Sequence, residues 1–414
     1  MIFKEEARSL PISKEMVTSA YKKVKSKKGS AGADDVSLES FEEDKQKQLY
    51  KIWNRLSSGS YFPPPVKTVL IKKSNGKERK LGVPTVGDRV AQQVVKTHLE
   101  PRLEKLFHDS SYGYRPNRSA HQAIAKVQKH VRHYAWVLDI DIKSFFDEVN
   151  HELLLNWLDR HLIEGEKWVR MYVSRWLKAK VLELDGTEIE NEIEGTPQGG
   201  VISPLLANLY LHYALDEWIT EYIQLPFVRY ADDVIIHCRS EQQAIKVLSL
   251  IRRRLKENSL RLNEEKTKIV YCQNYQRKHR KDKAKKFDFL GYSFKPHMVM
   301  MGGKLKLGYG CSISTASIKR IVESWKKDEF HRWTFTELSQ IADKYNDKLR
   351  GIINYYGKHK RWILVKLYRA FDFRLAKWAR NKYKRFKKSY PRAYAWLRTI
   401  KRDYPNLFHH WKYY

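Results

Sequence analysis

Two apolar, strand-forming runs meet at a pair of adjacent carboxylates in the segment FVRYADDVIIHC, residues 227–238. Valine, isoleucine, phenylalanine and tyrosine favour β-strands, and the polar centre between the runs favours a tight turn. The segment therefore predicts a β-hairpin with Asp232 and Asp233 at its turn. Two like charges so close together are costly unless a cation joins them. The pair is expected at one edge of a sheet.

A second strand, AWVLDIDI at residues 135–142, alternates with period two and ends near Asp141. If this strand neighbours the hairpin, Asp141 converges with Asp232 and Asp233. Carboxylate oxygens favour Mg²⁺ or Mn²⁺, and two such ions held by shared aspartates suit in-line phosphoryl transfer. From spacing alone Asp139 is an alternative ligand, because it lies on the same face of the strand.

The remaining pattern mixes strands with helices and ends in helices, which predicts an α+β body followed by a helical part. A basic hairpin is expected around the Asn-Gly pair in residues 66–84, a strand pair within 180–194 and a strand at 287–294. Helices are expected at 88–107, 120–134, 145–162, 203–222, 240–258 and from about 312 to the end.

The chain is strongly basic, with 80 Lys and Arg against 47 Asp and Glu and a net charge of +33. Residues 301–414 alone hold 28 basic and 8 acidic residues, a net of +20. Because 42% of residues are hydrophobic, the chain can fold, and the charge must lie mainly on a folded surface. This predicts a polyanionic partner, although a solvated basic face is the alternative. Aromatic residues that alternate with basic ones support a nucleic-acid surface: Trp362, Tyr368, Phe371, Phe373, Trp378, Tyr383 and Phe386.

Cysteine usage and hydropathy indicate where in the cell the protein is expected. Cys238, Cys272 and Cys311 are far apart and form no CxxC pair, which argues against a disulfide scaffold or a zinc module. No stretch approaches the roughly 20 apolar residues of a membrane span. We therefore expect a cytoplasmic protein that is neither exported nor embedded in a membrane.

A series of motifs resembles that of group II intron reverse transcriptases, in the same order along the chain. The YADD at 230–233 is similar to the YxDD box of reverse transcriptases, and DIKSFFDEVNH at 141–151 resembles their other metal-binding motif. The other matching segments are GSAGADD from 29, RKLGVPTVGDRVAQQ from 79, SYGYRPNRSAHQAI from 111, GTPQGGVISPLLANLYL from 195, LRLNEEKTKIV from 260, FLGYSF from 289 and LRGIINYYGKH from 349. The resemblance covers nearly the whole chain.

The resemblance implies a right-hand polymerase whose catalytic and metal-binding aspartates are Asp141, Asp232 and Asp233. Ile142 would lend its backbone carbonyl to a metal. Two Mg²⁺ ions are the implied cofactors, with Mn²⁺ as a substitute.

The same resemblance assigns contacts with the incoming nucleotide. Lys73 and Arg79 match residues that contact the triphosphate, with Lys72 as an alternative to Lys73. Phe146, or else Phe145, matches the aromatic residue under the sugar, which would exclude a 2′-hydroxyl group.

Further contacts are expected with the sugar, the primer and the template. Gln198 matches a residue near the nucleotide sugar, with Gly199 and Gly200 allowing a close backbone approach. Gly291 and Tyr292 resemble the primer grip, Arg115 is a candidate primer or template contact, and Lys266 is a weaker candidate near the active site.

The expected domains are an N-terminal extension and the start of the fingers (1–60), fingers and palm (61–300), a helical thumb or maturase domain (301–390) and a short basic C-terminal segment (391–414). Because no cysteine pairs follow the maturase motif, the chain resembles the subclass without an endonuclease domain.

The implied function is RNA-directed DNA synthesis, with assistance to intron splicing and mobility. Its partners would be an RNA template, a DNA primer, dNTPs, group II intron RNA and a DNA target. Two alternatives remain: a reverse transcriptase co-opted for defence or repair, and a non-enzymatic RNA-binding splicing factor. Whether the protein is a monomer or a dimer is open.

Overall fold

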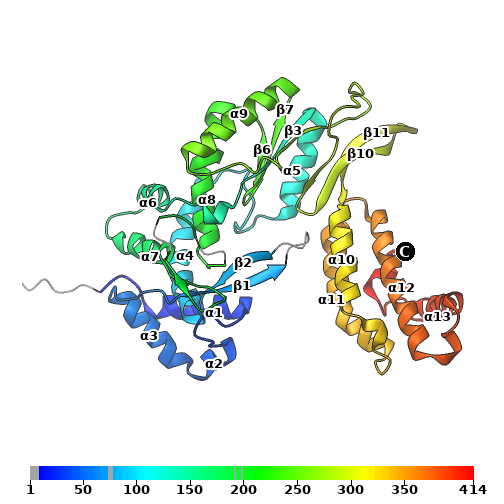
Figure 1. Cartoon of the computed structure of the whole chain (residues 1–414), viewed down its shortest axis with the longest axis horizontal. Coiled ribbons are helices and arrows are strands. Elements are labelled where there is room, and N and C mark those ends of the chain that lie inside the picture. Colours follow the sequence, from blue (N-terminus) through cyan, green and yellow to red (C-terminus); the bar gives the residue numbers. More distant parts are fainter. Residues whose placement is uncertain (1–8, 73–77, 191–192, 197–198) are drawn as a thin grey trace, which may run out of the picture. The chain divides into compact units, whose positions relative to one another are not determined.

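The computed structural model describes residues 9–72, 78–190, 193–196 and 199–414, and the chain divides into two compact units (Figure 1). The first unit contains Met1–Val127 and Trp136–Ile269, and the second contains Gln128–Ala135 and Val270–Tyr414. Each unit therefore has its own core, and each is described by itself.

Several helices of the first unit begin at a residue whose polar side chain caps them. The side chains of Ser13, Ser37, Thr85, Asn150 and Ser240 each accept a hydrogen bond from a backbone N–H of the first turn. Most of α4 is buried, so it forms the centre of this core. The helices are α1 (Lys14–Lys27), α2 (Leu38–Glu43), α3 (Lys45–Ser57), α4 (Val86–Leu106), α5 (Ala120–His133), α6 (His151–Asp159), α7 (Lys167–Leu177), α8 (Ser203–Leu211) and α9 (Glu241–Glu257). Helix α5 crosses the boundary between the units, because its residues from Gln128 onward belong to the second.

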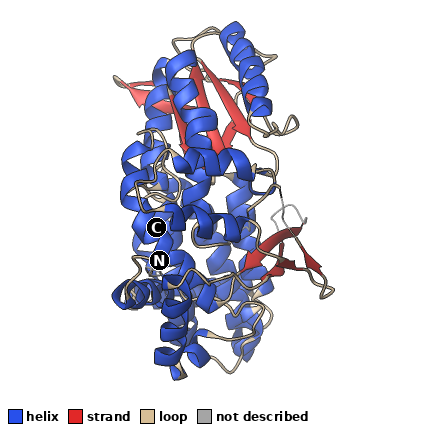
Figure 2. Cartoon of the chain, turned by 90° about the vertical axis from the view of Figure 1, so that its left-hand side faces the viewer, coloured by secondary structure: helices blue, strands red, loops and turns tan. Residues whose placement is uncertain are grey.

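Figure 2 shows the sheets as separate groups of strands. One sheet has the order β6-β7-β3-β8 and another has the order β2-β1-β4-β5. Helix α9 packs on β3 and β7. The strands are β1 (Val66–Lys72), β2 (Glu78–Val83), β3 (Trp136–Asp141), β4 (Val181–Leu182), β5 (Glu188–Ile189), β6 (Phe227–Tyr230), β7 (Asp233–Cys238) and β8 (Lys268–Tyr271), the last of which crosses the boundary between the units.

Several expected elements of the first unit are confirmed. Strands β6 and β7 form the hairpin expected at 227–238, β1 and β2 form the basic hairpin, and β4 and β5 form the short strand pair. The Asn-Gly pair lies outside the described residues. The helix expected from residue 145 is wrong at its start: residues 145–147 form a 3₁₀ turn, and α6 begins only at His151, because Asn150 caps it.

The second unit contains an antiparallel sheet and a set of helices. The sheet has the order β11-β10-β9, with strands β9 (Phe287–Phe289), β10 (Tyr292–Met301) and β11 (Lys304–Ile313). The helices are α10 (Thr315–Lys327), α11 (Leu338–Tyr356), α12 (Val365–Lys382) and α13 (Tyr390–Asp403). The long β10–β11 hairpin was not predicted, and a domain boundary at residue 300 would cut through it. Its signal is Gly302-Gly303, both with positive φ, between two strand-forming runs.

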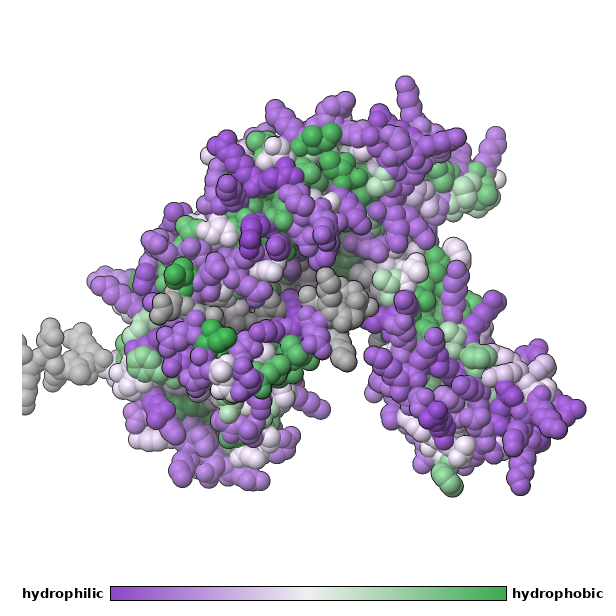
Figure 3. Space-filling view, in the orientation of Figure 1, coloured by the Kyte–Doolittle hydropathy of each residue, from purple (hydrophilic) through white to green (hydrophobic). Residues whose placement is uncertain are grey.

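The aromatic residues in and around α12 were expected to form a nucleic-acid surface, and this expectation is wrong for most of them. Tyr368, Phe371, Trp378 and Phe386 are buried in the core of the second unit, whereas Trp362 and Phe373 are exposed. On α12, Tyr368, Phe371 and Trp378 therefore belong to the buried face of the helix. Figure 3 shows a mostly hydrophilic face with small, separate hydrophobic patches. Within the described ranges, no helix is both long and apolar enough to cross a membrane.

Candidate active site

The antiparallel pairing of β3 with β7 brings three aspartates together. Asp141, the last residue of β3, lies directly opposite Asp233, the first residue of β7, and Asp232 precedes Asp233 in the turn. Asp139 pairs with Ile235, farther into the sheet, so the register favours Asp141 over Asp139 as the third carboxylate. Ala231, in the same turn, has a φ of 56°.

The three aspartates influence one another electrostatically. Although Asp233 is exposed at the start of β7, partial desolvation of its carboxyl group, followed by the negative charges of Asp232 and Asp141, raises its pKa to about 7. Burial also raises the pKa of Asp232; the nearby positive charge of Arg79 opposes this rise, and the charge of Asp141 adds to it. The site therefore holds negative charge at a cost that a bound cation would relieve.

A loop from 261 to 267 supplies a positive charge to the site. The ammonium group of Lys266 lies 3.1 Å from Oδ2 of Asp141, and the N–H of Asp141 donates to Oγ1 of Thr267 at 3.4 Å. The main chain fixes the loop, since Asn263 N–H donates to the carbonyl of Asp141 at 2.8 Å and Ile142 bridges to Leu262. Lys266 thus belongs to the aspartate cluster.

The carboxylates fit hard divalent cations by chemistry, since oxygen ligands and mutual repulsion both favour binding. Among the described residues, however, no group of three or more carboxylate, histidine or cysteine side chains is gathered as a formed metal cluster. Asp141 pairs with Lys266 instead. Ile142 is buried and its main chain is tied to the loop at Leu262.

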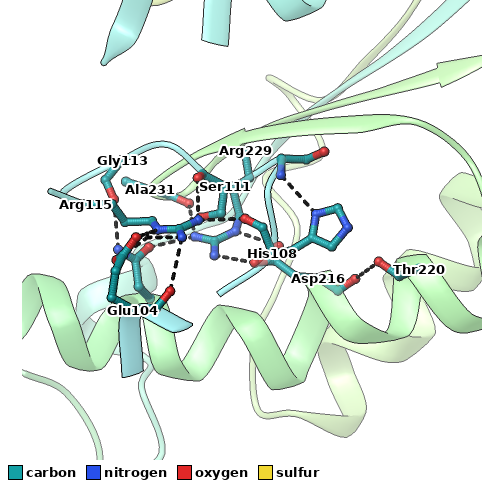
Figure 4. A network of polar contacts seen from close by, with 11 residues as sticks. Glu104, His108, Ser111, Gly113, Arg115, Asp216, Thr220, Arg229 and Ala231 are labelled. Carbon is teal, nitrogen blue, oxygen red and sulfur yellow. Dashed lines mark hydrogen bonds and ion pairs between the residues drawn. The ribbon is translucent and has the colours of Figure 1, made fainter. Parts of the chain in front are cut away.

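A buried ion pair supports the aspartate turn (Figure 4). Arg229 and Asp216 are both 0% exposed, and the guanidinium donates to the carboxylate at 2.7 and 2.5 Å. The same guanidinium donates to the carbonyl of Ala231 at 3.1 Å and to Oδ1 of Asn208 at 3.0 Å. Arg229 therefore connects the core of the unit to the turn that carries Asp232. A charged residue inside an apolar strand was the sequence signal for this role.

The loop at 111–115 packs directly against the aspartate turn. A Cβ atom on Gly113 would lie 2.4 Å from the backbone nitrogen of Ala231, so only glycine fits there. Asn208 fixes this approach by donating to the carbonyl of Gly113 at 2.8 Å. Next to it, the charge of Asp232 contributes to a raised pKa at Tyr114, for which burial is the larger cause.

Arg115, the candidate primer or template contact, has a side chain that is buried against the protein. Its side chain is 3% exposed and forms an ion pair with Glu104 at 2.7 Å. It also donates to the carbonyls of His108 and Ser111 at 2.6 and 2.8 Å, as Figure 4 shows. Arg115 therefore holds the 111–115 loop in place, and its guanidinium is committed to the protein.

Phe146 lines a cavity of about 180 Å³, together with Lys80, Gly82 and Thr196. Acidic side chains also line this cavity: Asp147, Glu183 and Glu194. Phe145 instead packs inward against Tyr210, with ring centroids 6.1 Å apart. The geometry thus favours Phe146 over Phe145 as the aromatic residue that a nucleotide would meet.

Of the other residues expected to contact the nucleotide, the structure describes some and not others. Arg79 on β2 lies near enough to lower the pKa of Asp232. Lys73 and Gln198 lie outside the described residues. The backbone of Gly199 lies close to that of Gly82. A Cβ atom on Gly199 would lie 2.1 Å from the carbonyl oxygen of Gly82, so this approach requires glycine.

The expected primer grip belongs to the second unit. Tyr292 is buried, and its hydroxyl donates to the carbonyl of Tyr355. Gly291 has a φ of 77°, and its carbonyl accepts from Ser314 N–H at 2.9 Å and from Ser317 Oγ at 3.0 Å. Both residues are tightly packed against helices α10 and α11, so any primer contact here would involve the main chain.

Residues 71–294, which include all three aspartates, match the family described as reverse transcriptase (RNA-dependent DNA polymerase). The match spans more than half of the chain. The chain therefore belongs to the reverse transcriptase family.

Within this family, the chain is similar to proteins encoded by group II introns. The chain is 35% identical over 266 residues to the group II intron-encoded protein LtrA of Lactococcus lactis subsp. cremoris, covering 63% of this chain and 42% of LtrA. It is 33% identical over 278 residues to protein YkfC of Escherichia coli, covering 58% and 72%. A putative COX1/OXI3 intron 1 protein of Saccharomyces cerevisiae is 24% identical over 420 residues, covering 83% and 49%. The chain thus spans less than half of LtrA and about half of the yeast protein.

Proposed function

We propose that this protein is an RNA-directed DNA polymerase of the group II intron type. The observation that carries the proposal is the convergence of Asp141, Asp232 and Asp233 at one end of the β3–β7 pair, within the segment that matches the reverse transcriptase family. In this role the chain would extend a DNA primer on an RNA template.

The aspartates would hold two Mg²⁺ ions, which when bound supply activation of the primer 3′-hydroxyl and neutralise the leaving pyrophosphate. The chain's own residues would prepare this site. Lys266 balances the charge of Asp141, and Arg79 presents a guanidinium that suits triphosphate oxygens. Arg229 and Gly113 fix the turn from which Asp232 projects.

RNA binding is proposed from charge and from the relatives. On α1 and at its C-cap, the lysines that we assign to this surface are all exposed, namely Lys22, Lys23, Lys25, Lys27 and Lys28. Residues 301–414 add a net charge of +20. Counterion release from such surfaces drives binding to nucleic-acid phosphates. Because LtrA is named as a group II intron-encoded protein, we propose intron RNA and a DNA target as partners, with splicing assistance as a second role.

Primer extension tests the proposed function. The protein with oligo(dT)-primed RNA, dNTPs and Mg²⁺ should lengthen the primer, EDTA should stop the reaction, and excess Mg²⁺ should restore it. A wild-type preparation that binds the primed RNA but never lengthens the primer would contradict the enzymatic proposal and leave a non-enzymatic RNA-binding factor.

Shortening Phe146 should weaken discrimination against ribonucleotides. In Phe146→Val the cavity gains room for a 2′-hydroxyl, so incorporation of rNTPs relative to dNTPs should rise about tenfold or more. Single-nucleotide extension with matched rNTP and dNTP measures the ratio. Phe145→Leu is the control, because Phe145 packs away from the cavity, and an equal rise in that variant would refute the assignment to Phe146.

Metal binding should depend on pH through Asp233. A carboxyl group must lose its proton to bind a cation, and the pKa of Asp233 is about 7, so the proton competes with the metal below pH 7. Apparent Mn²⁺ affinity should rise about fivefold from pH 6 to pH 7 and no more than about twofold above pH 7. The EPR signal of free Mn²⁺ measures it. Asp233→Asn should flatten the profile, and a flat wild-type profile would show that Asp233 carries no such proton.

A further inference from the structure

A cavity of about 500 Å³ lies in the second unit, and its lining residues all belong to that unit, whereas the proposed catalytic aspartates belong to the first. Its walls are the last turns of α5, the loop at 274–276 and one face of the β10–β11 hairpin. The polar and aromatic side chains that line it include Gln128, Arg132, Asn274, Tyr275, Gln276 and His297.

Two glycines of β11 leave space for the side chains on the hairpin face of this cavity. Gly308 pairs with His297 and Gly310 pairs with Lys295 in the β10–β11 register. A Cβ atom on Gly308 would lie 2.9 Å from the side chain of Val299, and one on Gly310 would lie 2.9 Å from the ring of His297. Side chains at these positions would therefore displace the cavity wall.

The loop wall is held by the main chain. Tyr275 N–H donates to the carbonyl of Leu307 at 2.8 Å, and Gln276 N–H donates to Oδ1 of Asn274 at 3.1 Å. The guanidinium of Arg277 donates to the carbonyls of Val131 and Arg132 at 3.1 and 2.9 Å, which ties the loop to the end of α5. The cavity is thus built into the unit before any ligand binds.

The lining suits a flat, uncharged ligand that is attached to a polyanion. The ring of Tyr275 is 43% exposed, and the ammonium of Lys306 lies 4.9 Å from its centroid. Amide groups of Gln128, Asn274 and Gln276 can donate and accept hydrogen bonds, and the described residues that line the cavity include no carboxylate. The adjoining residues 276–286 carry seven Lys or Arg and one Asp.

We propose that this cavity binds an unpaired nucleobase of single-stranded RNA, which stacks on Tyr275 while Arg132 and Lys306 contact the flanking phosphates. Aromatic stacking, amide groups and neighbouring cations are the means by which proteins read splayed-out bases. The proposal rests on the proposed function only in taking RNA as the partner. It adds a site for unpaired RNA that is separate from the aspartate cluster.

The test compares Tyr275→Ala with Tyr275→Phe in the full chain. Fluorescence anisotropy with labelled oligo(U) should show about fivefold or greater weakening for Tyr275→Ala and near wild-type binding for Tyr275→Phe, because phenylalanine keeps the stacking face. The ratio should persist as salt rises, since stacking is not screened as phosphate contacts are. Tyr222→Ala is the matched control, because Tyr222 is 73% exposed and lies in the first unit. Its affinity should stay within about twofold of wild type.

The outcomes separate this proposal from the proposed function. Equal affinity of wild type and Tyr275→Ala for oligo(U) would overturn the cavity assignment. So would an equal loss on fully paired duplex RNA, in which no base is free to enter. Primer extension with the same wild-type preparation reports on the polymerase separately: its failure contradicts the proposed function, whereas extension combined with equal oligo(U) affinities contradicts only the cavity.

Discussion

Asp232→Ala is expected to abolish primer extension while leaving RNA affinity nearly unchanged. Asp232 lies in the turn next to Asp233, which faces Asp141 across the β3–β7 pair, so its removal takes away one of three clustered carboxylates. The proposed pair of metal ions would then lose one of its shared aspartate ligands. RNA affinity should survive, because it depends on basic surfaces and not on this group.

Two controls make this result interpretable. Asp232→Asn keeps the shape of the side chain but not its charge, and it should be as inactive as Asp232→Ala. Asp185→Ala removes an exposed aspartate from the turn between β4 and β5, and it should extend primers as the wild type does. If Asp232→Ala loses RNA binding together with activity and unfolds at a lower temperature, Asp232 is a structural residue and the catalytic assignment fails.

Arg229→Met is expected to destabilise the first unit by about 3–5 kcal/mol, because it leaves the charge of Asp216 buried without its partner. Chemical denaturation followed by tryptophan fluorescence measures the change. Activity should fall as well, since the hydrogen bond from Arg229 to the carbonyl of Ala231 is lost.

A double variant separates stability from positioning. Arg229→Met with Asp216→Leu replaces the buried pair by apolar side chains, and it should recover most of the lost stability. Extension should remain low, because methionine cannot donate to Ala231 or to Asn208. Full recovery of activity in the stable double variant would show that Arg229 only neutralises Asp216 and does not position the turn.

The sequence predicted the hairpin around Asp232 and Asp233 because both flanks are β-forming and the centre is polar. It also predicted the strand that ends at Asp141. Their pairing, with Asp141 opposite Asp233, could only be proposed, because period-two patterns specify strands but not which strands are neighbours. The register shown here also gives a physical reason to prefer Asp141 to Asp139.

Other features could not be predicted because they depend on contacts between distant segments. Nothing in the sequence indicated that the candidate contact Arg115 is buried and forms an ion pair with Glu104, eleven residues earlier in the chain. The aromatic residues of α12 alternate with basic ones in the sequence, but helical geometry turns one face inward, so Phe371 and Trp378 are buried. The partner of Arg229 lies in another element, so the strand alone gives no indication of Asp216.

The most direct test of the central claim is to sequence the product made on a mixed-sequence RNA template. The wild-type chain with a labelled DNA primer, all four dNTPs and Mg²⁺ should produce DNA that is complementary to the template up to its 5′ end. Products that fail to match the template, or a primer that stays unextended while the RNA remains bound, would contradict RNA-directed synthesis at the site of Asp141, Asp232 and Asp233.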